Sequence, residues 1–502
     1  MKVLVTGGTG LVGKSAVDHL LRRGHTVRLL SRHADQDSRQ WSEGVEPRTA
    51  DMSDADSLRG AADGCDAVLH VAGIVDESPP ELTFQAVNVD GTRRMVEEAR
   101  RAGVRRFVYV SSLGADRGES GYHRSKKAAE EVVRAEFPDD WLICRPGNVY
   151  GPGDEVVSLL LKIVRTLPVV PTVGTGDQEF QPVWADDLGA AMAMAVERTD
   201  LSCRVLELAG VERTSTNDLL ERFSKLTGKE PARLPVPEWL AQFGARAVDA
   251  VGVKLPVNAD QITMLQEGNV IPPGGTNALT EVFGVTPTTL DEGLAKLADA
   301  LPEKLPSEGT GRLHRERFWA DIQGSRLSPE EALALVRDDF GSLVPEGLLQ
   351  VAAEPGTATR LEKGATLTLA VPLRGTVQVR VMEVEPRAIT NVTVQGHFFA
   401  GVIRFLTAEP EPGVVRFEVR AYTRSASLLD RLAVRTVGKV AQTMTWSTVV
   451  EEVVRRSGGT APDGVQSEDE VVSAEEAEGV EKWSEHLVME RKREESPDVG
   501  SG

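Results

Sequence analysis

The chain has 502 residues, 41% of them apolar, and a formal net charge of −19 at pH 7. This length predicts two or three domains with sizeable hydrophobic cores. Because so acidic a surface repels phosphate backbones and anionic lipids, we expect no nucleic-acid partner.

Signals for export, membrane insertion and metal binding are missing from the sequence. Met1 leads directly into the predicted strand Lys2-Val3-Leu4-Val5, and the sequence has no charged leader followed by an apolar signal core. No uncharged apolar run approaches about 18 residues, so we expect no membrane span. The three cysteines form no C-x-x-C pair, and we expect no metal site. These patterns predict a cytoplasmic protein, and none of them assigns an oligomeric state.

Residues 1–150 alternate short apolar segments with amphipathic ones. Helical patterns such as Lys14–Arg23 and Arg93–Ala102 separate the apolar segments. Nearly continuous apolar strands alternating with helices indicate an α/β class with a doubly wound parallel sheet, covered on both faces. The predicted strands are Val3–Thr6, Thr26–Leu30, Ala67–Val71, Phe107–Val110 and Leu142–Cys144.

Residues 151–300 are mixed, and we expect them to supply most substrate contacts. The prolines and glycines of 301–327 predict a linker to a second domain. Helices are predicted in the mixed region at Leu219–Leu226, Trp239–Val253 and Leu290–Leu297.

A smaller α+β domain is predicted over residues 328–456. Ser328-Pro329-Glu330-Glu331 combines an N-cap serine, a proline at the first helical position and a glutamate at the third. A long amphipathic helix, roughly Leu428–Val454, closes the unit and is expected to cover one face of an antiparallel sheet. The predicted strands are Leu367–Leu373, Val377–Val381, Ile389–Val394, Val402–Phe405 and Val414–Tyr422.

The apolar face of this second sheet suggests either a ligand cavity or a packed core. A curved sheet covered by one helix tends to leave a cavity, and large apolar cavities are the usual ligand sites. The residues assigned to this face include Val377, Val379, Val381, Val392 and Val394. Residues 457–502, rich in Gly, Ser and Glu, are expected to form a largely disordered acidic tail with at most a short helix around Trp483–Met489.

A glycine-rich loop follows the first strand and fits two phosphate-binding patterns. Gly8–Ser15 spells the P-loop pattern G-x-x-x-x-G-K-S, whereas Gly7, Gly10 and Gly13 spell a dinucleotide loop. Both patterns direct backbone N–H groups and a helix N-terminus at phosphate oxygens.

The ends of the later strands favour the dinucleotide loop. A P-loop protein needs an acidic residue at such a strand end to help hold Mg²⁺. The predicted strands instead end in Ala72-Gly73 and Ser111-Ser112. We therefore predict a Rossmann-type sheet that binds a nicotinamide dinucleotide.

The end of the second strand bears on the choice of cofactor. It reads Ser31-Arg32 and carries no acidic residue that would accept hydrogen bonds from the adenosine ribose. Because an arginine can pair with a 2′-phosphate, Arg32 favours NADP(H) over NAD(H), the alternative being a solvated arginine.

Tyr122 and Lys126 have the spacing Y-x-x-x-K. Positions four residues apart share a helix face, so the lysine ammonium would lie beside the phenol and lower its pKa. Tyr122 could then exchange a proton with a substrate oxygen while hydride moves to or from the nicotinamide.

These stretches together resemble the extended or atypical branches of the short-chain dehydrogenase/reductase superfamily. The resemblance covers about residues 1–300. In chain order it rests on Thr6-Gly7-Gly8-Thr9-Gly10-Leu11-Val12-Gly13, Asp51-Met52, Val71-Ala72-Gly73, Asn88-Val89-Asp90-Gly91-Thr92, Val110-Ser111-Ser112, Tyr122 with Lys126, the run from Arg145-Pro146 to Asp154, and Gln181–Asp187.

The resemblance implies roles for individual residues. Ser112 would polarise the substrate carbonyl, Tyr122 would be the acid/base, Lys126 would also bind the nicotinamide ribose, and Asn88 would support the relay. One departure from the family is that only ten positions separate Ser112 from Tyr122. The implied cofactor contacts are Gly7, Thr9, Gly10, Leu11, Val12, Gly13, Ser31, Arg32, Asp51, Met52, Ala72, Gly73, Lys126, Pro146 and Val149.

Within the superfamily the chain looks most like the group that contains the nucleotide-binding accessory subunit of respiratory complex I. The second domain resembles a bacterial domain of unknown function with a helix-grip appearance, in which His397 is either a site residue or an ordinary hydrogen-bonded histidine. Two functions are therefore expected. One is an NADPH-dependent oxidoreductase acting on the carbonyl or hydroxyl of a small, hydrophobic substrate. The other is a non-catalytic NAD(P)H-binding sensor or assembly protein with a ligand-binding C-terminal domain.

Overall fold

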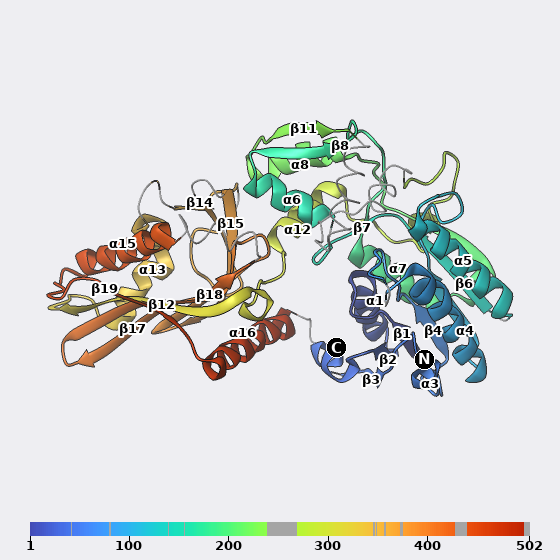
Figure 1. Ribbon diagram of the computed structural model, residues 1–502, viewed down its shortest axis with the longest axis horizontal. Coiled ribbons are helices and arrows are strands. Elements are labelled where there is room, and N and C mark those ends of the chain that lie inside the picture. Colours follow the sequence, from blue (N-terminus) through green and yellow to red (C-terminus); the bar gives the residue numbers. More distant parts are fainter. Residues whose placement is uncertain are drawn as a thin grey trace.

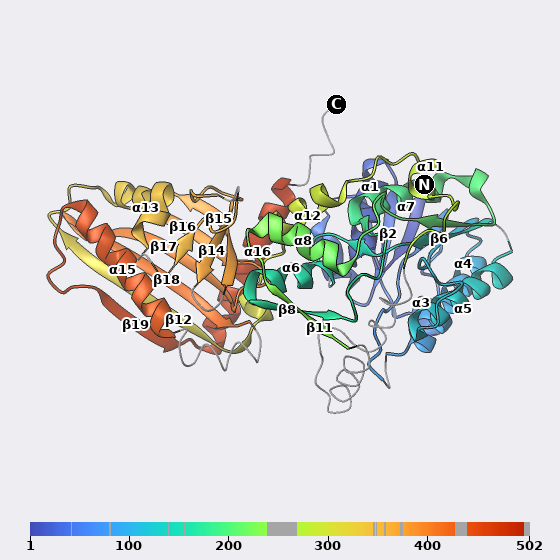
Figure 2. The ribbon, with the colours of Figure 1, turned by 90° about the horizontal axis from the view of Figure 1, so that it is seen from above.

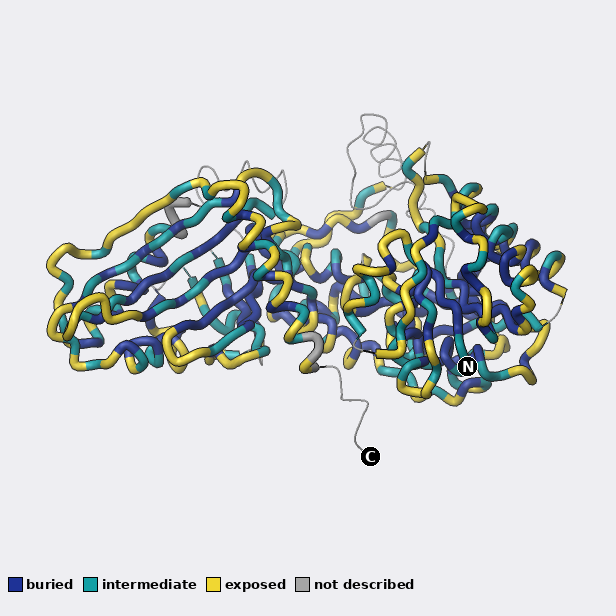
Figure 3. Tube along the Cα trace, turned by 90° about the horizontal axis from the view of Figure 1, so that it is seen from below, coloured by how far each residue is buried: buried dark blue, intermediate teal, exposed yellow. Residues whose placement is uncertain are grey.

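The computed structural model describes residues 1–237 and 269–495, apart from residues 42, 80, 81, 139, 155, 345, 346, 348, 356, 357, 372–374 and 427–438. The chain folds into two domains that lie side by side (Figure 1). We call residues 1–300 the N-terminal domain and residues 310–495 the C-terminal domain. Long segments in the interior of each domain are buried, and exposed residues concentrate at turns and edges (Figure 3). No helix in the described ranges is long and apolar enough to cross a bilayer.

The N-terminal domain is built on a seven-stranded sheet with the order β10-β6-β5-β4-β1-β2-β3. Every neighbouring pair in it is parallel, which confirms the predicted doubly wound sheet. The strands are β1 (Lys2–Thr6), β2 (Thr26–Ser31), β3 (Val45–Thr49), β4 (Ala67–His70), β5 (Arg106–Val110), β6 (Asp140–Pro146) and β10 (Arg204–Leu208).

Helices cover both faces of this sheet. One face packs against α1 (Leu11–Arg22) and α7 (Ala185–Glu197), and the other against α4 (Gly91–Arg101) and α5 (Gly121–Glu136). The smaller elements are α2 (Ala34–Asp37), the 3₁₀ turn η1 (Ser38–Gln40), α3 (Ala55–Leu58), the π-helical turn η2 (Gln85–Asp90), β7 (Val149–Tyr150), β9 (Val183–Trp184), the 3₁₀ turn η3 (Thr199–Leu201) and α11 (Ala278–Glu281).

A separate apolar cluster lies on the side of the N-terminal domain that faces the C-terminal domain (Figure 2). It is built from α6 (Val157–Thr166), α8 (Thr216–Thr227) and α12 (Leu290–Asp299), beside the strand pair β8 (Val169–Val173) and β11 (Ala232–Val236). Helices α8 and α12 confirm the helices predicted at Leu219–Leu226 and Leu290–Leu297. The helix predicted at Trp239–Val253 lies outside the described residues.

The C-terminal domain contains an eight-stranded sheet with the order β13-β14-β15-β16-β17-β18-β12-β19, antiparallel throughout. The strands are β12 (Thr310–Gln323), β13 (Gln350–Val351), β14 (Thr366–Val371), β15 (Gly375–Glu385), β16 (Ala388–Thr393), β17 (Phe399–Glu411), β18 (Val414–Ser425) and β19 (Gln466–Val471). The 3₁₀ turn η4 (Pro306–Glu308) precedes β12, and the helices are α13 (Pro329–Leu343), α15 (Lys439–Ser457) and α16 (Ala474–Glu495).

The helix start at Ser328 is confirmed. The Glu331 amide donates to Ser328 Oγ at 3.2 Å, and the Ser328 amide donates to Glu331 Oε2 at 2.8 Å. The linker predicted at 301–327 is wrong for residues 310–323, which form β12. Phe318, Ala320 and Ile322 alternate into the core, but neighbouring charged residues hide that pattern in the sequence.

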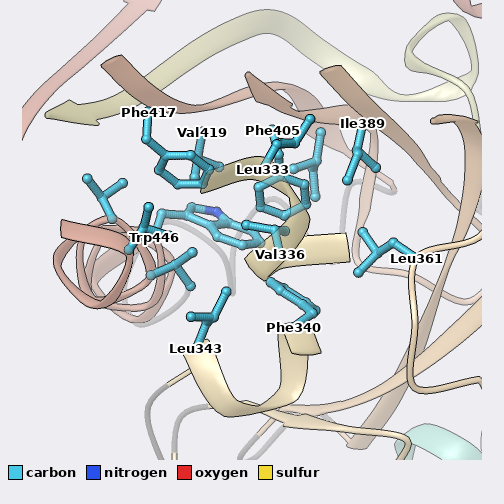
Figure 4. Close-up of a cluster of buried hydrophobic side chains, with 14 of the residues drawn as sticks. Leu333, Val336, Phe340, Leu343, Leu361, Ile389, Phe405, Phe417, Val419 and Trp446 are labelled. Carbon is cyan, nitrogen blue, oxygen red and sulfur yellow. The ribbon is translucent and has the colours of Figure 1, made fainter. Parts of the chain in front are cut away.

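Helices α13 and α15 together fill one face of this sheet, with Trp446 among the aromatic side chains between them (Figure 4). The prediction that five valines share this face is wrong. Val377, Val379 and Val381 do lie in this core. Because Val379 pairs with Thr393 in the β15–β16 register, Val392 and Val394 point to the opposite face.

The prediction of a disordered tail is wrong for residues 466–495. Strand β19 extends the sheet beside β12, and α16 covers the face opposite α13 and α15. Leu487 and Val488 pack on Val392, while Glu476 and Glu481 pair with Arg315 and Arg424, each at 2.6 Å. The tail is ordered because apolar side chains of α16 pack on the sheet and its acidic residues pair with arginines on the strands.

Candidate functional site

A cavity of about 860 Å³ opens at the carboxyl ends of the central parallel strands. Ligands of open α/β sheets bind at this edge, where the order of the strands reverses. Every cofactor-contact residue implied by the sequence lines the cavity, and so do Ser112, Tyr122 and Lys126. Asn88 is the one implied site residue that does not.

The glycine loop between β1 and α1 has the geometry that phosphate binding requires. Gly7 has φ +67°, and a Cβ there would lie 2.7 Å from the Ala72 amide nitrogen. A Cβ on Gly13 would lie 2.1 Å from the Gly7 carbonyl oxygen. Helix α1 starts after Gly10, which supplies no side-chain cap, so its first N–H groups remain available to an anion in the cavity.

The end of β2 forms part of the cavity wall. Ser31 Oγ donates to Asp37 Oδ2 at 2.5 Å, so this hydroxyl is already engaged. Arg32 is exposed and makes no ion pair with any residue in the described ranges. Hydrogen bonds from Ser53 lower the pKa of Asp51, with smaller contributions from the charges of Arg32 and Arg94. The Arg32 guanidinium is thus available to a negative group bound at the cavity wall.

Tyr122 and Lys126 lie one turn apart on α5, whose N-terminus is capped by Ser120. The Lys126 ammonium donates to the Val110 carbonyl at 3.0 Å and lies 6.0 Å from the centre of the Tyr122 ring. Burial lowers the pKa of Lys126 to about 8, while the charge of Glu130 acts in the opposite direction. The lysine is therefore fixed at the end of β5, within the cavity.

Burial raises the pKa of Tyr122 to about 12, and its hydrogen bond with Ser112 acts in the opposite direction. The expected lowering of this pKa by Lys126 is not observed, because burial dominates and the ammonium is directed at the Val110 carbonyl. At neutral pH the phenol is protonated and can donate a proton.

Asn88 supports the site from behind the cavity wall. Its Oδ1 accepts from the Ile74 amide at 2.8 Å, and its Nδ2 donates to the Ile74 carbonyl and to Ser125 Oγ, each at 3.0 Å. Ser125 Oγ in turn donates to the Tyr122 carbonyl at 2.7 Å. Asn88 therefore joins the loop after β4 to the turn of α5 that carries the tyrosine.

Two buried groups near the site were missed in the sequence. His70 makes hydrogen bonds with Thr6 Oγ1 at 2.7 Å and Thr92 Oγ1 at 3.0 Å, and burial lowers its pKa to about 3. Glu130 accepts from Ser111 Oγ at 2.6 Å and from two nitrogens of Arg145, each at 2.7 Å. For His70 the available signal was a polar residue inside an apolar strand, which does not identify its partners. Glu130 lies in a charged helical stretch and gave no such signal.

The mouth of the cavity is apolar. Val75, Leu82 and Val156 line it and are 43%, 39% and 49% exposed, although large apolar side chains are usually buried. Ile74 and Phe180 line the cavity with them. This arrangement suits a ligand that brings apolar surface to the entrance.

His397 lies outside this cavity and has the contacts of an ordinary hydrogen-bonded histidine, the second of its two expected roles. Its Nδ1 accepts from the Phe399 amide at 3.0 Å, and burial lowers its pKa to about 4. The ring stacks on Phe398 with 4.6 Å between centroids.

Two family models match the chain. Residues 3–206 match the NAD dependent epimerase/dehydratase family, and residues 343–451 match a domain of unknown function, DUF1990. Ceramide reductase of Caulobacter vibrioides is 33% identical over 240 residues, which are 47% of this chain and 74% of that protein. The chain belongs to the NAD-dependent epimerase/dehydratase family, and its N-terminal domain has an NAD(P)-binding Rossmann fold.

Two other relatives carry names that indicate different roles. Sterol demethylase protein B of Methylococcus capsulatus is 32% identical over 48% of this chain and 79% of its own length. The mitochondrial NADH dehydrogenase [ubiquinone] 1 alpha subcomplex subunit 9 of Arabidopsis thaliana is 27% identical over 64% of this chain and 80% of its own length. The second similarity bears out the sequence-based resemblance to the complex I group.

Proposed function

We propose that the protein is an oxidoreductase that transfers hydride between NADP(H) and the carbonyl or hydroxyl group of a small, apolar substrate. The observation that carries the proposal is the placement of Ser112, Tyr122 and Lys126 in the same cavity as the glycine loop. The proton donor, the hydroxyl that orients the carbonyl and the loop that binds the dinucleotide therefore line the same cavity.

Each of these residues has its own role in carbonyl reduction. The glycine loop and Lys126 would hold a reduced nicotinamide dinucleotide, which would supply the hydride for the carbonyl carbon. Ser112 donates a hydrogen bond to the carbonyl oxygen, and Tyr122 gives its proton to that oxygen as negative charge develops. The Lys126 ammonium, held at the Val110 carbonyl, would bind the nicotinamide ribose.

The preference for NADP(H) rests on Arg32. Its guanidinium stands at the cavity wall and makes no ion pair with a carboxylate in the described ranges, and no acidic side chain ends β2. A charge-assisted hydrogen bond to a 2′-phosphate contributes about 1.5–3 kcal/mol, roughly a tenfold to hundredfold preference.

The apolar substrate class rests on the mouth of the cavity. Val75, Leu82 and Val156 would be covered by such a substrate, which is favourable by about 25 cal/mol for each Å² of apolar surface removed from water. Two relatives carry names that refer to apolar lipids, ceramide and sterol.

A non-catalytic role is the second candidate. The similarity to the complex I subunit favours a protein that binds NAD(P)H as a structural or sensing cofactor, with a C-terminal domain that binds a ligand or partner. In that case the nucleotide would remain bound without turnover.

One experiment separates the two candidates. The nucleotide that copurifies with the protein is identified, and loss of the reduced-nicotinamide absorbance band is followed with quinones, sugar nucleotides and isoprenoid ketones. Oxidation of NADPH by at least one carbonyl, abolished by Tyr122→Phe, supports the enzyme. A protein that binds NADPH tightly and oxidises it with none of these carbonyls supports the accessory role.

A further inference from the structure

One ion pair joins the two domains and is almost completely buried. Arg165, near the C-terminal end of α6, donates from Nε and from its second terminal nitrogen to the two carboxylate oxygens of Glu354, each at 2.8 Å. The two side chains are only 4% and 3% exposed. The first terminal nitrogen of Arg165 donates to Gln378 Oε1 at 3.1 Å. A helix of the N-terminal domain is thus held by two side chains of the C-terminal domain.

The backbone at this end of α6 also contacts the C-terminal domain. Thr376 Oγ1 donates to the Arg165 carbonyl at 3.3 Å. Gly375 has φ +77°, and a Cβ there would lie 2.2 Å from the same carbonyl oxygen. Val394 of the C-terminal domain packs in the apolar cluster that contains Leu161. Side chains, backbone and apolar core therefore all fix the position of α6.

The opposite end of α6 forms part of the cavity. Val156 and Val157 line it, and Val156 is one of the exposed apolar side chains of its mouth. The Asp154 carboxylate accepts from the Val157 and Ser158 amides at 2.6 and 3.0 Å, which caps the helix. The ten residues of α6 span about 15 Å, so a displacement at one end is passed to the other by a single rigid helix.

We propose that the C-terminal domain positions the substrate-side wall of the NAD(P) cavity through α6, with Arg165 as the positioning residue. A bidentate pair excluded from water tolerates little displacement, because a buried charge without its partner is strongly unfavourable. The consequence for substrate binding rests on the proposed oxidoreductase function, whereas the placement of the wall does not depend on turnover.

The test compares Arg165→Met and Glu354→Gln in the full-length protein. The control is the double variant Arg198→Met/Asp200→Met, which removes an exposed pair whose side chains are 40% and 61% accessible. Circular dichroism and the melting temperature establish folding. Glu354→Gln keeps the shape of the side chain and carries the test if Arg165→Met does not fold.

The first measurement is hydrogen–deuterium exchange with NADP⁺ bound. We expect the amides of residues 157–160 to exchange about tenfold faster in the Arg165 or Glu354 variant and unchanged in the control, because loss of the pair frees the helix to open. Unchanged exchange in a folded variant of the pair would overturn the proposal.

The second measurement is NADPH-dependent reduction of 9,10-phenanthrenequinone. We expect KM for the quinone to rise about fivefold while kcat and the Kd for NADPH stay within about twofold, since only the substrate wall has moved. A general loss of folded protein would instead lower kcat at unchanged KM, which would contradict a positioning role. If the parent protein reduces no carbonyl, the proposed function fails, and the exchange measurement alone decides the role of Arg165.

Discussion

The Lys126 ammonium donates a hydrogen bond to the Val110 carbonyl at 3.0 Å, which ties α5 to the end of the central strand β5. Tyr122 lies one turn away on the same helix and contacts Ser112, two residues beyond Val110. The proton donor, the cation and the carbonyl-orienting hydroxyl are therefore positioned by one strand end and one helix.

Carbonyl reduction should slow as pH rises through about 8, the value to which burial lowers the pKa of Lys126. Above it the lysine loses the charge with which it would bind the nicotinamide ribose, whereas Tyr122, with a pKa of about 12, stays protonated. The measurement is kcat/KM for NADPH-dependent reduction between pH 6 and pH 10. In a folded Lys126→Arg variant, which keeps its charge, the decline should be absent. A parent profile that stays flat to pH 9.5 would show that this lysine charge is not required.

Arg32→Asp should reverse the cofactor preference. The parent is expected to bind NADPH about tenfold to hundredfold more tightly than NADH, and the variant to prefer NADH, since a carboxylate repels the 2′-phosphate and accepts hydrogen bonds from the ribose. Dissociation constants from quenching of tryptophan fluorescence give the ratio. Arg39→Ser, an exposed neighbour on η1 that does not line the cavity, is the control. Equal affinities of the parent for both nucleotides would remove the basis for this assignment.

His70 should make the protein less stable in acid. Its pKa is about 3 in the folded state against 6.5 when solvated, so between those values only the unfolded chain binds the proton. The contribution of His70 to the free energy of unfolding is complete above pH 6.5. It is lost as pH falls towards 3, by about 1.4 kcal/mol per pH unit in the steep part of the range. Denaturant midpoints at pH 5 and pH 7.5 measure the loss, which should shrink in His70→Gln and persist in His486→Gln, at an exposed position. An equal loss of stability in all three proteins would show that other groups cause it.

Removal of α16 should destabilise the protein. The helix buries Leu487 and Val488, each contributing about 1.5–3 kcal/mol. It also carries Arg491, which shares the buried Glu303 with Arg380 at 2.6 Å each. A chain that ends at residue 473 should melt several degrees lower, while Glu478→Ala/Lys482→Ala, an exposed pair on the same helix, should leave the melting temperature within about one degree. An unchanged melting temperature after truncation would mean that the helix does not dock.

The nucleotide site could be predicted from the sequence because its constraints are local. A Cβ at Gly7 or Gly13 would collide with neighbouring backbone, so the glycine pattern itself reports the loop. The tyrosine and lysine share a helix face at a fixed spacing. Such features need no knowledge of distant contacts.

The misassigned parts depend on contacts between distant segments. Strand β12 carries arginines whose partners, Glu418, Glu468 and Glu470, lie more than 100 positions away in the chain. These pairs accompany the backbone pairing by which a segment that looks like a linker and an acidic segment that looks disordered become neighbouring strands. The valines of β15 and β16 could not be assigned to a face because the strand register was unknown. The Arg165–Glu354 pair joins two domains and leaves no local pattern.

We expect Tyr122 to give its proton to the carbonyl oxygen while hydride moves from the nicotinamide to the carbonyl carbon in this cavity. The most direct measurement uses NADPH deuterated at the transferable position of its nicotinamide, with mass spectrometry of the alcohol formed from a reactive carbonyl. The parent protein should place one deuterium on the carbinol carbon of the product. Tyr122→Phe should give no labelled product and should still bind NADPH with about the parent affinity. Equal deuterium transfer by Tyr122→Phe, or none by a parent protein saturated with NADPH and carbonyl, would show that Tyr122 does not have this role.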